Sequence, residues 1–288
     1  MTDERSASFA ATLRARKHRG DVIVMVTAYD FASAQVAELA GVDMVLVGDS
    51  AAMTVLGYAS TRLVSVDEML MLTRAARRGA PNTFLVGDLP FGTYEPSDDA
   101  ALATARRFVD AGCDAVKMEG MGDIVDRARS LCAAGITVMG HVGLTPQQTG
   151  VGEGFRVHGR SAESALEIIA GARALEQAGC FAIVAEAIPA AVTREITPRV
   201  QVPVIGIGAG PADGQVLVFN DLVGLYDAHT PRFVKRYATT KASMVDAVSR
   251  FAADVRAREF PAREHEYGME ELEVEQMRRR LDGPPGSD

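Results

Sequence analysis

Short apolar runs recur along the chain at intervals that fit a repeated strand-and-helix unit. They are rich in Val and Ile and do not alternate polar with apolar residues, which is typical of parallel strands covered on both faces. Most are separated by segments with helical spacing, each about three turns long. Eight strands are therefore expected, the last the least clearly marked: Val22–Val26, Met44–Val47, Phe84–Val86, Ala115–Met118, Ile136–Met139, Ala182–Ala185, Val204–Ile207 and Val216–Phe219.

Glycines mark the joints between helices and the strands that follow. Glycine takes the left-handed conformation past a helix end more easily than other residues. The segment Ser65-Val66-Asp67-Glu68 is a capping box that predicts a helix running to Gly79. The alternation through eight strands predicts an α/β fold, a closed (β/α)8 TIM barrel, in preference to a doubly wound sheet. Four joints carry the pair Ala-Gly, at Gly41, Gly112, Gly135 and Gly179.

The two ends of the chain and one internal connection depart from this rhythm. We expect one domain over residues 1–288, with a barrel core at about 21–240 and extra C-terminal helices and a tail over 241–288. The amphipathic helix predicted over Met269–Leu281 either docks on a neighbouring subunit or lies on the surface, and Gly283–Asp288 is expected to be a disordered tail. Gly143–Arg160 has the length of a functional loop.

Composition narrows the class of protein. A chain of 288 residues with 48% hydrophobic and 24% charged residues has enough apolar material for one large core. The net charge of −8 and the dispersed basic residues argue against nucleic acid or an anionic membrane as a partner. No signal peptide or spanning helix is recognisable. Cys113, Cys132 and Cys180 lack any CxxC spacing and are expected to be small core residues of a reduced, cytoplasmic protein.

Ionisable residues stand at the ends of five consecutive predicted strands. Barrel enzymes assemble their sites at this end, where side chains from several strands converge. Any one of these residues could instead cap the next helix or close a structural ion pair, and capping is what we expect of Asp30. The set as a whole indicates an active site: Asp49, Asp88, Lys117 with Glu119, His141 and Glu186.

Three of these residues are acids on adjacent strands. Asp49, Asp88 and Glu119 offer only oxygen ligands, which favours a hard cation such as Mg²⁺ over a structural zinc. Lys117 lies two residues before Glu119 and therefore shares its face of the strand. One of this pair can bind metal while the other neutralises an anionic substrate.

Two glycine-rich segments leave alternatives open. His141 lies in Gly140-His141-Val142-Gly143, where a ligand can approach the backbone, although a core histidine bonded to a carbonyl group would fit as well. Gly206–Gly210 follows the seventh strand and either holds a phosphate, lets a large ligand approach, or allows tight barrel packing. It is not a dinucleotide fingerprint, because no suitable acid follows it.

These segments together resemble the ketopantoate hydroxymethyltransferase family. The matching stretches keep their order and rough spacing from about residue 21 to about residue 266, so the resemblance is specific and covers most of the chain. They are Thr27–Asp30, Val47–Ser50, Gly87–Phe91, Val116–Gly120, Gly140–Gln147, Ile205–Gly210 and Asp213–Val218.

The resemblance implies a barrel of the phosphoenolpyruvate/pyruvate superfamily that forms a homo-oligomer, such as a decamer. It implies hydroxymethyl transfer from 5,10-methylenetetrahydrofolate to 3-methyl-2-oxobutanoate, through a metal-stabilised enolate, to give 2-dehydropantoate. Residue roles carry over by motif: Asp49, Asp88 and Glu119 as Mg²⁺ ligands, Asp49, Ser50, Asp88 and Lys117 as substrate contacts, Glu186 as the proton acceptor, and Lys117 and His141 as further catalytic residues.

Some positions depart from the family pattern and put the exact substrate in doubt. They are Ala51-Ala52, Arg62-Leu63, the loop over residues 148–154, and His158. A superfamily lyase acting on a 2-oxo or 2-hydroxy acid would use the same acids, but no cysteine lies in the long loop where such relatives carry a catalytic one. A binding barrel that has lost turnover is the other alternative, and the fold alone does not decide between them.

Overall fold

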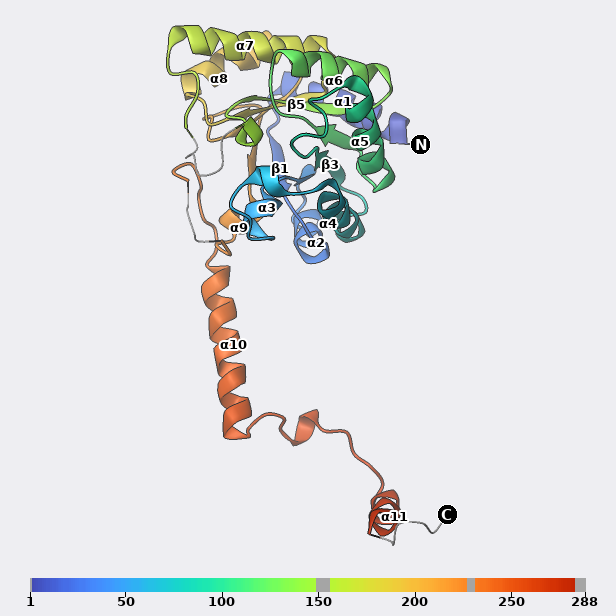
Figure 1. Cartoon of the computed structure of the whole chain (residues 1–288). Coiled ribbons are helices and arrows are strands. Elements are labelled where there is room, and N and C mark those ends of the chain that lie inside the picture. Colours follow the sequence, from blue (N-terminus) through green and yellow to red (C-terminus); the bar gives the residue numbers. More distant parts are fainter. Residues whose placement is uncertain (1, 149–155, 227–230, 283–288) are drawn as a thin grey trace. The chain divides into compact units, whose positions relative to one another are not determined.

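The computed structural model describes residues 2–148, 156–226 and 231–282 (Figure 1). The chain forms two compact units, residues 1–238 and residues 239–288. In the first unit eight parallel strands close into a barrel, with β1 paired to both β2 and β8, which confirms the predicted (β/α)8 fold. The strands are β1 (Ile23–Thr27), β2 (Met44–Val47), β3 (Phe84–Asp88), β4 (Ala115–Lys117), β5 (Val138–Gly143), β6 (Ala182–Glu186), β7 (Val204–Ile207) and β8 (Gly214–Leu217).

Helices surround the barrel and begin and end at the residues that the sequence marks. Ser65 and Glu68 form the predicted capping box of α4. Asp30 caps α2, so this acid has the structural role expected of it. The glycines at 41, 112, 135 and 179 all have positive φ, between 73° and 108°, as predicted for the joints. The helices of this unit are α1 (Thr2–Arg19), α2 (Phe31–Leu39), α3 (Ala51–Thr54), α4 (Val66–Gly79), α5 (Asp98–Asp110), α6 (Asp123–Ala133), α7 (Ala162–Gln177), α8 (Ala190–Ile196) and α9 (Phe219–Leu222).

Three strand predictions were wrong in their extent by two residues or more. The third strand continues past its predicted end at Val86 to Asp88. The fifth strand continues past the apolar run to Gly143, because its pairing with β6 passes through His141, which lies opposite Val184. The eighth strand begins at Gly214, two residues earlier than predicted. A Cβ at Gly214 would lie 2.6 Å from the main-chain oxygen of Ile23, so this close approach to β1 requires glycine.

The N-terminal helix α1 closes the bottom of the barrel, and the sequence pattern did not predict it. Leu13 is fully buried, and the ring of Phe9 stacks on Phe84 at 4.0 Å between centroids. These residues join the strand side chains that fill the barrel interior. The helix therefore serves as the floor of the barrel, at the N-terminal ends of the strands.

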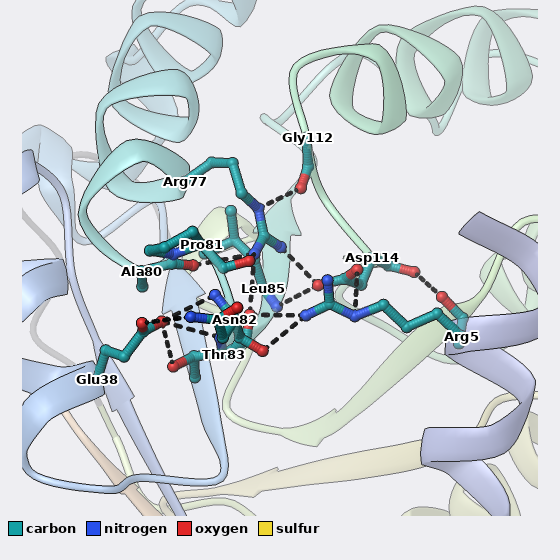
Figure 2. A network of polar contacts seen from close by, with 11 residues as sticks. Arg5, Glu38, Arg77, Ala80, Pro81, Asn82, Thr83, Leu85, Gly112 and Asp114 are labelled. Atoms are coloured by element: carbon teal, nitrogen blue, oxygen red, sulfur yellow. Dashed lines mark hydrogen bonds and ion pairs between the residues drawn. The ribbon is translucent and has the colours of Figure 1, made fainter. Parts of the chain in front are cut away.

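A polar network fixes the N-terminal ends of β3 and β4 beside this floor (Figure 2). The Arg77 guanidinium lies 2.5 Å from the carboxylate of Asp114, which also accepts a hydrogen bond from the main chain of Leu85. The carboxylate of Glu38 accepts hydrogen bonds from the main-chain nitrogens of Asn82 and Thr83. In barrels this face supports stability, and the opposite face carries the chemistry.

The second unit contains α10 (Thr240–Ala257) and α11 (Glu271–Leu281), which confirms helices where the C-terminal pattern predicted them. Neither helix has a buried residue. The predicted tail over Gly283–Asp288 lies outside the described residues. No helix in the part of the chain that the structure describes has the length and apolar character needed to cross a membrane.

Candidate active site

Each of the six candidate side chains lies at the C-terminal end of a strand, and the strands are neighbours in the barrel. Asp49 follows β2, and Asp88 and Lys117 are the last residues of β3 and β4. Glu119 lies two residues beyond β4, His141 lies within β5, and Glu186 ends β6. Glu186 is partly exposed, with 18% of its side chain accessible, and the other five are buried.

The three acids come together as the strand order requires. Asp49, Asp88 and Glu119 each offer a carboxylate oxygen, and these oxygens all lie within 4.8 Å of one another. The main-chain nitrogen of Asp49 also donates to Asp88 Oδ2 at 3.2 Å, which ties β2 to β3 at this level. A donor set of oxygens alone fits a hard divalent cation.

Lys117 supplies the positive charge of the cluster. Its Nζ lies 2.8 Å from Asp88 Oδ1, 3.1 Å from Glu119 Oε1 and 3.3 Å from His141 Nδ1. Burial by itself would lower the pKa of Lys117, but the surrounding carboxylates of Asp88, Glu119 and Asp49 raise it well above its ordinary value. The amine is therefore an ammonium, which disfavours a Schiff-base role.

One ammonium does not balance three carboxylates. Burial, followed by the charges of Asp88 and Glu119, raises the pKa of Asp49 well above its ordinary value. Burial also raises the pKa of Asp88 despite its contact with Lys117. Burial opposes ionisation of Glu119 as well, but Lys117 and His141 bring the pKa of that carboxyl down to about 2. The surplus negative charge is what a divalent cation would offset, so the residues fit one.

His141 links the acid cluster to Glu186. Its Nδ1 lies 3.5 Å from Glu119 Oε1, and its Nε2 lies 3.4 Å from Glu186 Oε2. The alternative of a core histidine bonded to a carbonyl group does not describe these contacts. Burial, and then the charge of Glu119, raises the pKa of Glu186 well above its ordinary value. Glu186 therefore lies at the edge of the site, and its carboxylate takes up a proton more readily than that of an ordinary glutamate.

Ser50 lies at the start of α3, next to Asp49. Its Oγ is 2.8 Å from the hydroxyl of Tyr29, which accepts a hydrogen bond from Thr27 Oγ1, also at 2.8 Å. Burial raises the pKa of Tyr29 to about 12, so its phenol stays neutral. This chain of hydroxyl groups holds the Ser50 side chain beside the acid cluster.

Two residues of the site were not identified as functional from the sequence. Gln147 and Tyr94 are almost completely buried, and both contact the backbone or side chain of the cluster acids. Gln147 fell within a segment that resembles the family, but neither spacing nor composition gave it a role. The signal that the sequence offered was a glutamine shortly after the end of a buried strand. A glutamine in an exposed loop has no need to be buried.

The glycine-rich turn and the atypical positions have local structural explanations. A Cβ at Gly210 would lie 2.4 Å from that of Ala190, and one at Gly208 would lie 2.6 Å from the ring of Phe233. Tight packing therefore accounts for these glycines.

Two of the positions that depart from the family pattern make contacts of their own. Ala51 is fully buried in α3, and the Arg62 guanidinium lies 3.9 Å from the ring centre of Phe91. Most of the atypical loop after β5 lies outside the described residues.

The closed parallel barrel, with its acids, lysine, histidine and glutamate at the C-terminal ends of the strands, belongs to the class of (β/α)8-barrel enzymes. The family model described as ketopantoate hydroxymethyltransferase matches residues 8–263, which is most of the chain. The chain belongs to this family, and the resemblance seen in the sequence is confirmed.

Relatives named for the same enzyme support this assignment, and solved structures are similar in fold. A 3-methyl-2-oxobutanoate hydroxymethyltransferase from Geobacillus kaustophilus is 51% identical over 89% of this chain and 93% of its own length. One from Thermus thermophilus is 50% identical over 88% of this chain and 97% of its own. The fold is similar to phosphonopyruvate hydrolase solved with oxalate and Mg²⁺, with a TM-score of 0.59, 15% identity, and coverage of 95% and 96% of the two chains. It is also similar to 2,3-dimethylmalate lyase, with a TM-score of 0.53, 18% identity, and coverage of 96% and 94%.

Proposed function

We propose that this enzyme transfers a hydroxymethyl group from 5,10-methylenetetrahydrofolate to 3-methyl-2-oxobutanoate, giving 2-dehydropantoate and tetrahydrofolate with uptake of one water. The names of relatives about half identical over most of the chain support the acceptor and the reaction. The observation that carries the proposal is the arrangement of three acids around one point, with a separate carboxyl, Glu186, at the edge of the same site.

Asp49, Asp88 and Glu119 would hold a Mg²⁺ ion, because they form a buried set of oxygen donors with surplus negative charge. When bound, Mg²⁺ would supply Lewis-acid polarisation of the 2-oxo group, which favours loss of a proton from the neighbouring carbon. The buried position of the acids excludes water from this part of the site and strengthens their interaction with the ion.

Lys117 and Ser50 are the substrate contacts that this chain provides beside the acids. The Lys117 ammonium carries the positive charge that a 2-oxo acid carboxylate requires. The Ser50 hydroxyl, held by Tyr29, offers a hydrogen bond next to Asp49. Together they orient the acceptor so that its branched carbon faces the edge of the site.

Glu186 removes the proton from the branched carbon. It is separate from the acid cluster, it is partly accessible, and its raised pKa favours proton uptake. A positioned general base contributes about 10²–10⁴-fold to the rate. His141, the further catalytic residue that the family resemblance implies, places Nε2 3.4 Å from Glu186 Oε2, while its other ring nitrogen faces Lys117 and Glu119.

The proposal extends to assembly and location. By family resemblance the enzyme forms a homo-oligomer, such as a decamer, and works on small molecules without nucleic acid or membrane. Its three cysteines are all free, which suits a reducing cytoplasm.

The decisive experiment follows the C3 proton of 3-methyl-2-oxobutanoate by NMR in D₂O. With enzyme and Mg²⁺ the proton should exchange, and adding 5,10-methylenetetrahydrofolate should convert the acid to 2-dehydropantoate. Chelation of the metal should stop both processes. Glu186→Gln should still bind the acid but lose exchange.

Three other results would overturn parts of the proposal. Exchange that survives in Glu186→Gln would move the base to His141 acting with water. Binding without exchange in the parent enzyme would identify a non-catalytic barrel. Cleavage of a carbon–carbon bond in a 2-oxo or 2-hydroxy diacid would identify a lyase.

A further inference from the structure

A single buried residue connects two of the cluster acids, through its side-chain amide and its main-chain nitrogen. Gln147, in the 3₁₀ turn Pro146–Gln148 after β5, donates from Nε2 to Asp49 Oδ2 at 3.1 Å. Its main-chain nitrogen donates to Glu119 Oε2, also at 3.1 Å. The residue is completely buried, so neither contact competes with solvent. Gln147 thus holds one oxygen of each of these two carboxylates.

The orientation of this amide is determined by its other two partners. Nε2 donates its second hydrogen to the main-chain oxygen of Leu89 at 2.9 Å. Oε1 accepts from the hydroxyl of Tyr94 at 2.6 Å, and that hydroxyl in turn accepts from the main-chain nitrogen of Glu119. Turning the amide over would place Oε1 against the oxygens of Asp49 and Leu89, leaving both without a donor. In the observed orientation both N–H groups and the oxygen of the amide have partners.

We infer that Gln147 is a positioning residue that sets the rotation of the Asp49 and Glu119 carboxylates for binding a divalent cation. Each carboxylate has two oxygens, and fixing one of them directs the other. This inference rests on the proposed Mg²⁺ site. Tyr94 acts one step further out, because it holds the amide and the main chain of Glu119 but touches no cluster carboxylate.

The contacts also join four connections of the barrel. Gln147 comes from the connection after β5 and Tyr94 from the one after β3, and the two acids they hold, Asp49 and Glu119, follow β2 and β4. The position of Gln147 on its connection therefore bears directly on the position of two acids of the cation site. In metal sites, loss of such an outer partner typically weakens metal affinity about 10–100-fold.

The test measures Mn²⁺ binding directly, from the electron paramagnetic resonance signal of the free aqueous ion. Gln147→Met keeps the length of the side chain and removes its amide, and it should raise the Mn²⁺ dissociation constant about 10–100-fold and alter the line shape of the bound ion. Tyr94→Phe leaves the amide in place without its anchor and should give a smaller increase in the same direction. Gln215→Met, on β8, is the matched control, because it removes a side-chain hydrogen bond of 3.0 Å to the main-chain oxygen of Gly210, and its affinity should not change.

The outcomes separate this inference from the proposed function. If the parent enzyme binds no Mn²⁺, both are overturned. If the parent binds Mn²⁺ and Gln147→Met binds it equally well, only the positioning role is overturned, even if the variant is thermally less stable. If Gln147→Met does not fold, Tyr94→Phe decides, and an unchanged dissociation constant overturns the inference.

Discussion

Replacement of Lys117 by Met tests whether the buried charges of the site depend on one another. The substitution keeps the aliphatic part of the side chain and removes the ammonium, which lies 2.8 Å from Asp88 Oδ1 and 3.1 Å from Glu119 Oε1. Lys117 is only 3% exposed, so water cannot replace it. Removing one partner of a buried ion pair costs about 3–5 kcal/mol, because the remaining charge is left uncompensated.

For a unit of this size, that loss corresponds to a decrease in Tm of about 6–20 °C. The assay is thermal or urea unfolding at neutral pH with a chelator present. The unpaired acids should have raised pKa values in the folded variant, so this state binds more protons than the unfolded chain at mildly acidic pH. The loss of stability should therefore shrink as the pH falls.

A surface pair with the same geometry gives the control. Arg19 and Asp21 also lie 2.8 Å apart, but the arginine side chain is 60% exposed. Arg19→Met should leave the unfolding free energy nearly unchanged, because exposed pairs contribute little. The reasoning would be refuted if Lys117→Met unfolded within about 1 kcal/mol of the parent at neutral pH.

Three further predictions use the same structure. Asp88→Ala should abolish metal-dependent turnover while the circular dichroism spectrum is retained, and unchanged turnover would rule out a ligand role. The rate of C3 proton exchange should fall as the pH is lowered through the raised pKa of Glu186, hence above the ordinary value of 4.5, because the base must be unprotonated; an acid limb at or below 4.5 would contradict this. Gly214→Ala should destabilise the barrel, measurable as a lower urea midpoint, because its Cβ would meet the Ile23 oxygen at 2.6 Å, whereas Gly268→Ala, with open space around it, should not.

The strand order and the convergence of the acids could be predicted from the sequence, because both depend on patterns among residues that are close together along the chain. Apolar runs separated by helical segments predict a parallel barrel, and a barrel places the residues after its strands at one end. Asp49, Asp88 and Glu119 are far apart in sequence, but each is attached to its own strand, so the topology alone brings them together.

The features that were missed depend on contacts between distant segments. The length of β5 follows from its pairing with β6, and it was missed because the apolar run is interrupted by glycines and His141 near its end. Gln147 and Tyr94 gain their positions from each other and from the main chain of Glu119, and no local pattern specifies that. The N-terminal helix has few apolar residues, and only its contacts with the side chains of the barrel interior explain its place.

That floor helix also constrains the order of folding events. Arg5 donates to the oxygen of Asn82, 77 residues later, and Lys17 donates to that of Val202, 185 residues later. During synthesis α1 leaves the ribosome before these acceptors exist, and β1 must likewise wait for β8. The helix can take its final position only when nearly the whole barrel has emerged.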